Sequence, residues 1–185
     1  MIKNTLLEIS ENFKKLSKNC SADIEKASEV IIEALNNNCK IMFCGNGGSA
    51  ADSQHLAAEL VGRYRKDRRP LAAISLTTDS SIISAISNDF SFDEVFTRQI
   101  EAVGKKGDIL YAISTSGKSK NIISGIKLAK ELGITVIGIT GCNANDMSDL
   151  CNILIKVPAS RPDRIQEMHI AIGQVICEII ETSLC

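Results

Sequence analysis

The sequence predicts a doubly wound α/β domain. Its 185 residues contain five apolar runs, each continuous rather than alternating, at residues 39–44, 71–76, 108–114, 134–140 and 153–157. Strands that are apolar throughout are buried on both faces, as in a parallel sheet covered by helices. No repeat, low-complexity tract or linker interrupts the pattern. We therefore expect one domain spanning residues 1–185, with helices over 1–37 preceding an α/β core over 38–185.

Two helices are expected before the first strand. An apolar seam with spacings of 4, 3, 4 and 3 marks the first, at Ile2, Leu6, Ile9, Phe13 and Leu16. Such a narrow seam packs against another helix, either in a partner subunit or in the same domain. The second helix is expected over residues 21–36, and the asparagine run that follows ends it because these side chains compete for backbone hydrogen bonds.

Further helices are expected between the strands and after the last one. They lie near residues 49–62, 80–87, 91–103, 119–132, 144–150 and 162–182. In a doubly wound sheet, ligands bind beyond the carboxyl ends of the strands, where the strand order reverses. The loops that follow the strands are therefore the first places to look for a site.

Composition narrows the class of function. The formal net charge is −1, Trp is absent, and Phe and Tyr total seven, which argues against a nucleic-acid interface. No signal peptide or apolar run of membrane-spanning length is present. Seven cysteines without a C-x-x-C pair suit a reducing compartment. We expect a cytoplasmic protein with no nucleic-acid or membrane partner.

Two loops after predicted strands have the composition of a phosphate site. Residues 45–49 (GNGGS) bring backbone N–H groups close to a ligand, and residues 114–119 (STSGKS) provide four hydroxyls at a helix N-terminus. A dinucleotide-binding loop would need an acidic residue about 20 positions on, and a P-loop would need an earlier glycine. Phosphate binding is favoured, with a helix-capping turn as the alternative for the second loop.

The helix after the glycine loop presents His55, Glu59 and Arg63 along one side. They form either an exposed face with a Glu59–Arg63 ion pair or a site in which Glu59 is a general base and His55 tunes its charge or shares a metal. The chain holds only two histidines, so a three-histidine zinc site is excluded. Arg63 begins a basic run at residues 63–69, which we expect to be a solvated loop.

The role of two further segments is not decided by composition or spacing. Asn88-Asp89 follows an apolar helix at a break, where a turn is the simplest explanation. In the last helix Gln174 interrupts an apolar pattern, and its spacing to Glu178 and Glu181 favours a solvent-facing stripe.

Four motifs together resemble the phosphoheptose isomerases of the sugar isomerase (SIS) domain family, over nearly the whole chain. They are CGNGGSAADSQHLAAELVGRYR, AISNDFSF, ISTSGKS and DRIQEMHI. The resemblance implies a three-layer αβα sandwich with a five-stranded parallel sheet, flavodoxin-like, plus N-terminal helices at a subunit interface. It also implies a homotetramer with active sites between subunits. The reaction would convert sedoheptulose 7-phosphate to D-glycero-D-manno-heptose 7-phosphate through an enediol, for bacterial lipopolysaccharide or capsule.

The resemblance also implies roles for individual residues. Glu59 would be the catalytic base, and zinc, one ion per subunit, would be held by His55, Glu59, Gln166 and the residue at position 174. Substrate contacts would come from Asn46, Gly47, Gly48, Glu59, Arg63, Asn88, Asp89, Ser114, Thr115, Ser116, Ser119, Asp163 and Gln166.

Position 174 departs from the family pattern. The family has a histidine there, as second catalytic residue and last zinc ligand, whereas this chain has Gln174. An amide cannot titrate near neutral pH, although its carbonyl can ligate a metal weakly or polarise a substrate oxygen. A related SIS protein that also lacks this histidine binds a replication initiator. A non-catalytic adaptor tetramer is therefore the alternative to an isomerase that uses Glu59 and Gln174.

Overall fold

The computed structural model describes residues 1–143 and 146–185. Within them, five parallel strands form one sheet in the order β2-β1-β3-β4-β5. The strands are β1 (Ile41–Gly45), β2 (Ala73–Ser75), β3 (Ile109–Ile113), β4 (Thr135–Thr140) and β5 (Ile153–Lys156). The strand order reverses between β1 and β3, which confirms the predicted doubly wound fold.

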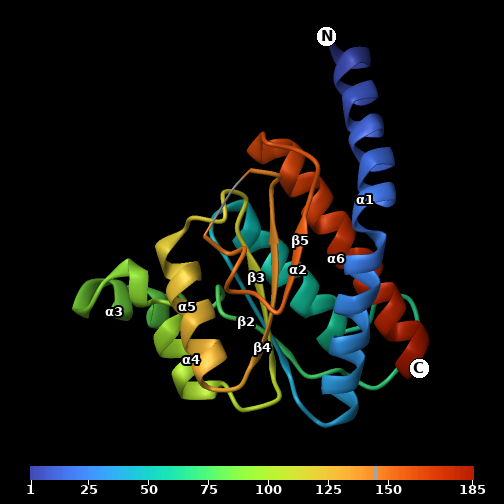
Figure 1. Ribbon diagram of the computed structural model, residues 1–185. Helices are drawn as coiled ribbons and strands as arrows, with labels where there is room; N and C mark the ends of the chain where they lie inside the picture. Colours follow the sequence, from blue (N-terminus) through green and yellow to red (C-terminus); the bar gives the residue numbers. More distant parts are fainter. Residues whose placement is uncertain (144–145) are drawn as a thin grey trace.

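Helices cover both faces of the sheet (Figure 1). One face is covered by α1 (Ile2–Asn36), α2 (Gly48–Val61) and α6 (Pro162–Leu184). The other is covered by α3 (Ser80–Asp89), the 3-10 turn η1 (Phe92–Glu94), α4 (Thr97–Val103) and α5 (Lys120–Glu131). The three-layer αβα arrangement is therefore confirmed.

Each strand divides its side chains between two cores. Phe43 and Tyr111 point toward α1, α2 and α6, whereas their neighbours Met42 and Leu110 point toward α4 and α5. All four are buried. This burial on both faces explains the continuous apolar runs of β1 and β3, which are buried at every position.

Four predicted helices differ in the structure. The two expected before β1 form one continuous helix, α1, because Ser17 and Ser21 bond back to carbonyls of the preceding turn and no glycine or proline interrupts it. The helix expected over 91–103 is divided into η1 and α4, and Thr97 hydrogen-bonds to Glu94 at the division. Of the helix expected over 144–150, the first two residues lie outside the described part, and 146–150 form turns.

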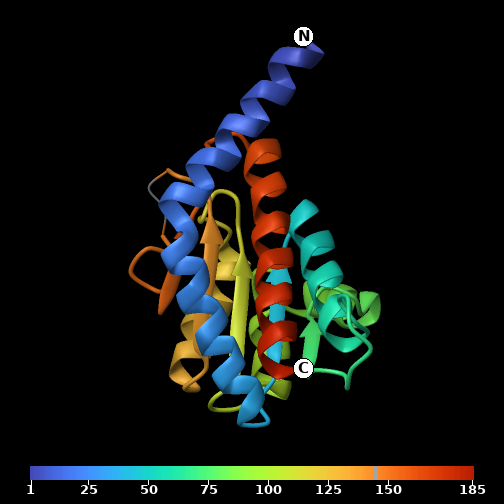
Figure 2. The ribbon, with the colours of Figure 1, turned by 90° about the vertical axis from the view of Figure 1, so that its right-hand side faces the viewer.

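The first turns of α1 extend beyond the rest of the molecule (Figure 2). Ile2 and Leu6 of the predicted seam are exposed there, whereas Leu16 is buried against the domain. None of the helices in the described residues is long and apolar enough to span a bilayer.

Candidate active site

The glycine loop and the serine-threonine loop meet where the strand order reverses. Asn46 follows β1, and Asn121 lies in the first turn of α5. Their side-chain amides donate to each other's oxygens at 2.9 Å in both directions. Asn121 is buried, and its oxygen also accepts the Ile122 N–H. This pair, which the sequence analysis missed, fixes the two loops side by side.

Two glycines shape the first loop. Gly47 has a φ of +56°, a conformation that side-chain-bearing residues rarely adopt. Gly48 lies so close to α6 that a Cβ there would stand 2.6 Å from Gln166 Nε2. The loop therefore needs glycine at both positions, and the predicted residues Asn46, Gly47, Gly48 and Gln166 lie together.

In the second loop, two of the four hydroxyls lie together before α5. Ser114 Oγ lies 3.2 Å from Ser119 Oγ and accepts the Gly117 N–H at 3.1 Å. Ser116 Oγ accepts the Lys118 N–H, and the Thr115 carbonyl accepts the Gly141 N–H. The Ser119 hydroxyl does not cap the helix it precedes. We call the two loops, residues 45–49 and 114–119, the cradle. Beside its glycine loop opens a cavity of about 130 Å³ that Thr77, Ile83, Phe92 and Phe96 also line.

A second group lies where α2 and α6 run side by side. His55 Nε2 is 3.1 Å from Glu59 Oε1, and Gln174 Nε2 is 3.1 Å from the same imidazole nitrogen and 3.3 Å from the same carboxylate oxygen. The prediction that Gln174 belongs to a solvent-facing stripe is therefore wrong. We call His55, Glu59 and Gln174 the catalytic face.

Comparison with known proteins assigns the chain to a family. The model of the SIS domain matches residues 6–141. A phosphoheptose isomerase of Nitratiruptor sp. is 50% identical over 98% of this chain and 97% of its own, and one of Akkermansia muciniphila is 46% identical over 99% and 96%. The chain belongs to the SIS domain family.

Solved structures from the family agree with the SIS fold seen here. Phosphoheptose isomerase GmhA from Neisseria gonorrhoeae has a TM-score of 0.93 and 39% identity, with 98% of this chain and 97% of that chain covered. A phosphoheptose isomerase from Francisella tularensis has a TM-score of 0.94 and 32% identity, with 98% and 96% covered. Among the two alternatives the sequence left open, these relatives favour the isomerase.

A carboxyl group that the sequence analysis missed lies beside the catalytic face of this SIS domain. Asp52 is on α2, one turn before His55, and its Oδ2 is buried without a hydrogen-bond partner. Burial raises its pKa to about 6, and the charge of His55 opposes that shift. Only the structure shows that this side chain points inward.

Within residues 1–143 and 146–185, four predicted site residues form no hydrogen bond or ion pair with the cradle or the catalytic face. Arg63 is exposed just beyond the end of α2. Asn88 and Asp89 lie in the last turn of α3, so the predicted turn is wrong, and the Asn88 amide donates to Asp89. Asp163 opens α6 and pairs with Arg161 and Arg164, and the hydrogen bond from Arg161 lowers its pKa to about 2.

Most of the basic run at residues 63–69 is exposed, as predicted, and Arg68 is the exception. Arg65 is exposed and pairs with Glu178, but the side chains of Arg68 and Glu181 are 3% and 4% exposed and form an ion pair. The expected position of Glu181 on a solvent-facing stripe is therefore also wrong.

The donor set for the predicted zinc ion is weak. In the described part of the chain, no group of three or more His, Cys, Asp or Glu side chains is arranged to hold a metal. The catalytic face offers one imidazole and one carboxylate, joined by the Gln174 amide. Gln166 lies eight residues earlier on α6, with its amide against Gly48. Zinc sites in proteins use three or four imidazole, thiolate or carboxylate ligands, so these residues do not fit such a site.

Proposed function

We propose that the chain isomerises sedoheptulose 7-phosphate to D-glycero-D-manno-heptose 7-phosphate. The observation that supports this most directly is the Glu59 carboxylate, 20% exposed and within 3.3 Å of both His55 and Gln174. A carboxylate fixed in this way is suited to move a proton between adjacent carbons. The product supplies heptose for lipopolysaccharide or capsule.

The reaction needs one general base and one group that stabilises the negative charge developing on the substrate oxygen. Glu59 removes a proton from C1 of the ketose, the C–H electron pair forms a C1=C2 double bond, and the C2 oxygen takes up a proton. Return of the proton to C2 and loss of the O1 proton then give the aldose. Atoms and electrons balance with no external oxidant or reductant.

Gln174 takes the place of the family histidine without its acid–base chemistry. Its amide donates to Glu59 and, in the reaction, donates to the developing oxygen charge of the enediol. An uncharged donor stabilises that charge electrostatically and needs no change of protonation state. Water provides the second proton transfer.

The cradle binds the phosphate in this proposal. Ser114, Thr115, Ser116 and Ser119 donate hydroxyls at the N-terminus of α5, where the helix dipole also favours an anion. Asn46, Gly47 and Gly48 contact the substrate from the other loop, and Asp163 and Gln166 contact its hydroxyls. Glu59 lies eleven residues along α2 from Gly48, about 16 Å along the axis. A sugar phosphate held by the cradle must therefore be long to reach it.

Zinc remains a prediction, and no step above depends on it. His55, Glu59, Gln166 and Gln174 are the residues that would meet the ion. Calorimetric titration with zinc tests the prediction: binding tighter than micromolar with one ion per subunit would support it, and no heat would refute it.

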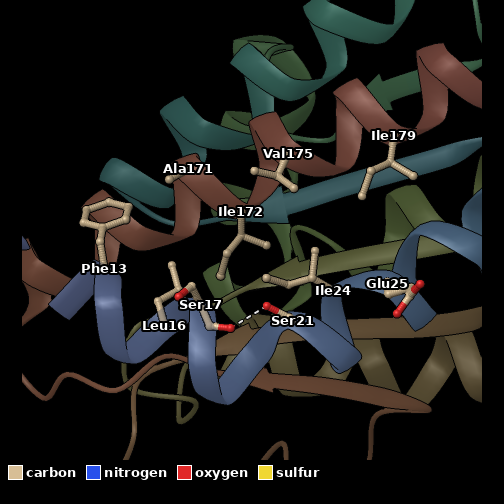
Figure 3. Close-up of a pocket in the computed structure, with 10 residues that line it drawn as sticks. All are labelled: Phe13, Leu16, Ser17, Ser21, Ile24, Glu25, Ala171, Ile172, Val175 and Ile179. Atoms are coloured by element: carbon tan, nitrogen blue, oxygen red, sulfur yellow. Dashed lines mark hydrogen bonds between the residues drawn. The ribbon is translucent and has the colours of Figure 1, made fainter. Parts of the chain in front are cut away.

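A homotetramer is the assembly we propose. A groove of about 470 Å³ runs between α1 and α6, and its lining is mostly apolar, with Phe13, Ile172, Val175 and Ile179 directed into it (Figure 3). Together with the exposed Ile2 and Leu6, it provides a surface for further subunits. Arg63, Asn88 and Asp89 would then reach the site of a neighbour. Sedimentation showing a stable monomer would contradict this assembly.

The cytoplasm is the compartment we propose. All seven cysteines are free, a pattern typical of proteins in reducing compartments.

One assay tests the proposed activity. The purified protein is incubated with sedoheptulose 7-phosphate, with and without zinc, and aldose formation is followed by NMR. Turnover is expected in both conditions. No product in either would refute the isomerase and leave the adaptor as the surviving alternative.

A further inference from the structure

A buried ion pair joins the end of α2 to the end of α6. The Glu181 carboxylate accepts the backbone N–H groups of residues 64, 65 and 66 at 3.2, 2.9 and 2.9 Å, and the Arg68 Nε at 3.1 Å. Burial would raise the pKa of Glu181, but the three backbone N–H groups and Arg68 together lower it. The carboxylate is therefore held in its charged form.

The guanidinium of Arg68 reaches the helix that bears the catalytic base. Its Nη2 donates to the carbonyl of Glu59 and its Nη1 to the carbonyl of Leu60, both at 2.8 Å. These carbonyls belong to the last turn of α2, which has no intrahelical donors for them. The cation thus caps the helix and is bonded to the main chain of Glu59 itself.

The same stripe of α6 bears Gln174 and Glu181. They are seven residues apart, two turns of helix, and so lie on one side. Between them, Cys177 is buried close enough to Glu59, Arg68 and Glu181 for their charges to affect its pKa. The two helices run in the same direction (Figure 2). Along them, Gln166 lies against Gly48, Gly173 against Leu56, and Gln174 against Glu59.

We propose that Arg68 and Glu181 are positioning residues that set the register of α2 against α6, and through it the distance from Gln174 to Glu59. The Leu56–Gly173 contact packs the two helices closely but is apolar and has no directional bond. The forked, charge-assisted network of Arg68 and Glu181 adds bonds of fixed geometry to that packing. This inference rests on the proposed function, since it assigns the pair to the same site.

The test compares this pair with a matched exposed pair on the same two elements. Arg68→Met and Glu181→Gln are expected to lower kcat roughly 10- to 100-fold with KM within threefold, because the cradle is untouched. Arg65→Met and Glu178→Gln remove the neighbouring ion pair, whose side chains are 65% and 46% exposed, and should keep kcat within twofold. Arg68→Lys keeps the charge without the fork and should fall between the two sets.

A second readout does not depend on activity. His55 and His169 are the only imidazoles of the chain, and His169 is buried on another side of α6. In Arg68→Met and Glu181→Gln the ring resonances of His55 should move, while those of His169 stay in place.

Three results would overturn the inference. One is folded variants with wild-type kcat and unchanged His55 resonances. Another is a shift of the ring resonances of both histidines, together with a fall in kcat and a rise in KM. That combination indicates a general disturbance of the fold. A third is an equal loss in the exposed pair. If the wild-type protein does not isomerise the substrate, the proposed function fails, whereas the His55 resonances still test the register.

Discussion

The cradle and the catalytic face obtain their geometry in different ways. Each cradle loop lies between a strand and the helix that follows it, and sheet order alone brings the two loops together. The catalytic face joins α2 and α6, which are more than a hundred residues apart, and depends on how two helices align. Binding should therefore depend on the cradle and turnover on the face, so that changes in each are separable.

Replacing the catalytic base should give the largest effect, a fall in kcat with little change in KM. In Glu59→Gln, the amide cannot accept the C1 proton, and we expect kcat to fall roughly 10³-fold with KM changed less than threefold. Steady-state kinetics with sedoheptulose 7-phosphate measures both. Full activity in this variant would show that another group is the base.

Disrupting the cradle should give the opposite pattern. Asn121→Ala leaves the partly buried Asn46 amide without its partner, which costs about 2 kcal/mol of stability and loosens the glycine loop. We expect KM to rise about tenfold while kcat stays within threefold. Ser84→Ala on α3, where the hydroxyl bonds only to its own helix, is the control. A fall in kcat with constant KM would show that the cradle and the catalytic face do not act separately on binding and turnover.

Restoring the family histidine at position 174 tests whether this position of the catalytic face contributes to zinc binding and turnover. Gln174→His places a second imidazole beside His55 and Glu59, making three ligands of the types zinc prefers. Zinc affinity should rise on the order of tenfold or more, measured by calorimetry. Unchanged affinity and unchanged kcat would place position 174 outside the chemistry.

The smallest effect concerns the side of α6 that faces the sheet. Burial lowers the pKa of His169 to about 4, with the Thr140 backbone opposing. The unfolded chain therefore binds this proton more readily, and stability is lost as pH falls from 6.5 toward 4. His169→Leu should remove that loss, which is about 3 kcal/mol. Urea unfolding across this pH range tests it, and an unchanged slope would contradict the assignment.

Asp52 acts in the other direction over part of the same range. Its raised pKa makes the folded chain hold a proton that the unfolded chain releases, so stability falls as pH rises from 3.8 through about 6. Asp52→Asn, measured alongside His169→Leu, separates the two contributions.

The sequence predicted the sheet and the cradle because both depend on local pattern. Continuous apolar runs identify buried parallel strands, and loop composition follows directly after them. The orientation of Gln174 and the burial of Arg68 and Glu181 could not be predicted in this way, since both depend on the register between two distant helices. Asn121 was missed for the same reason: an asparagine in a first helical turn gives no sign of a partner 75 residues earlier.

The continuous α1 shows a second limit. The sequence predicted two helices before the first strand, the second over residues 21–36. Near the start of that second helix, Ser17, Asn19 and Ser21 are residues that favour helix ends. In the structure the serines bond back to the preceding turn, and the buried residues on either side continue the helix against α6.

The central claim is that Glu59 moves a proton through an enediol without a partner imidazole at position 174. It is tested most directly by running the reaction in D₂O and examining C2 of the aldose by NMR. We predict deuterium at C2 in a substantial part of the product, and no product from Glu59→Gln in the same period. Because the Glu59 carboxylate is 20% exposed, the proton it carries should exchange with solvent before it reaches C2. Complete retention of hydrogen at C2 would contradict transfer through a Glu59 carboxylate open to solvent.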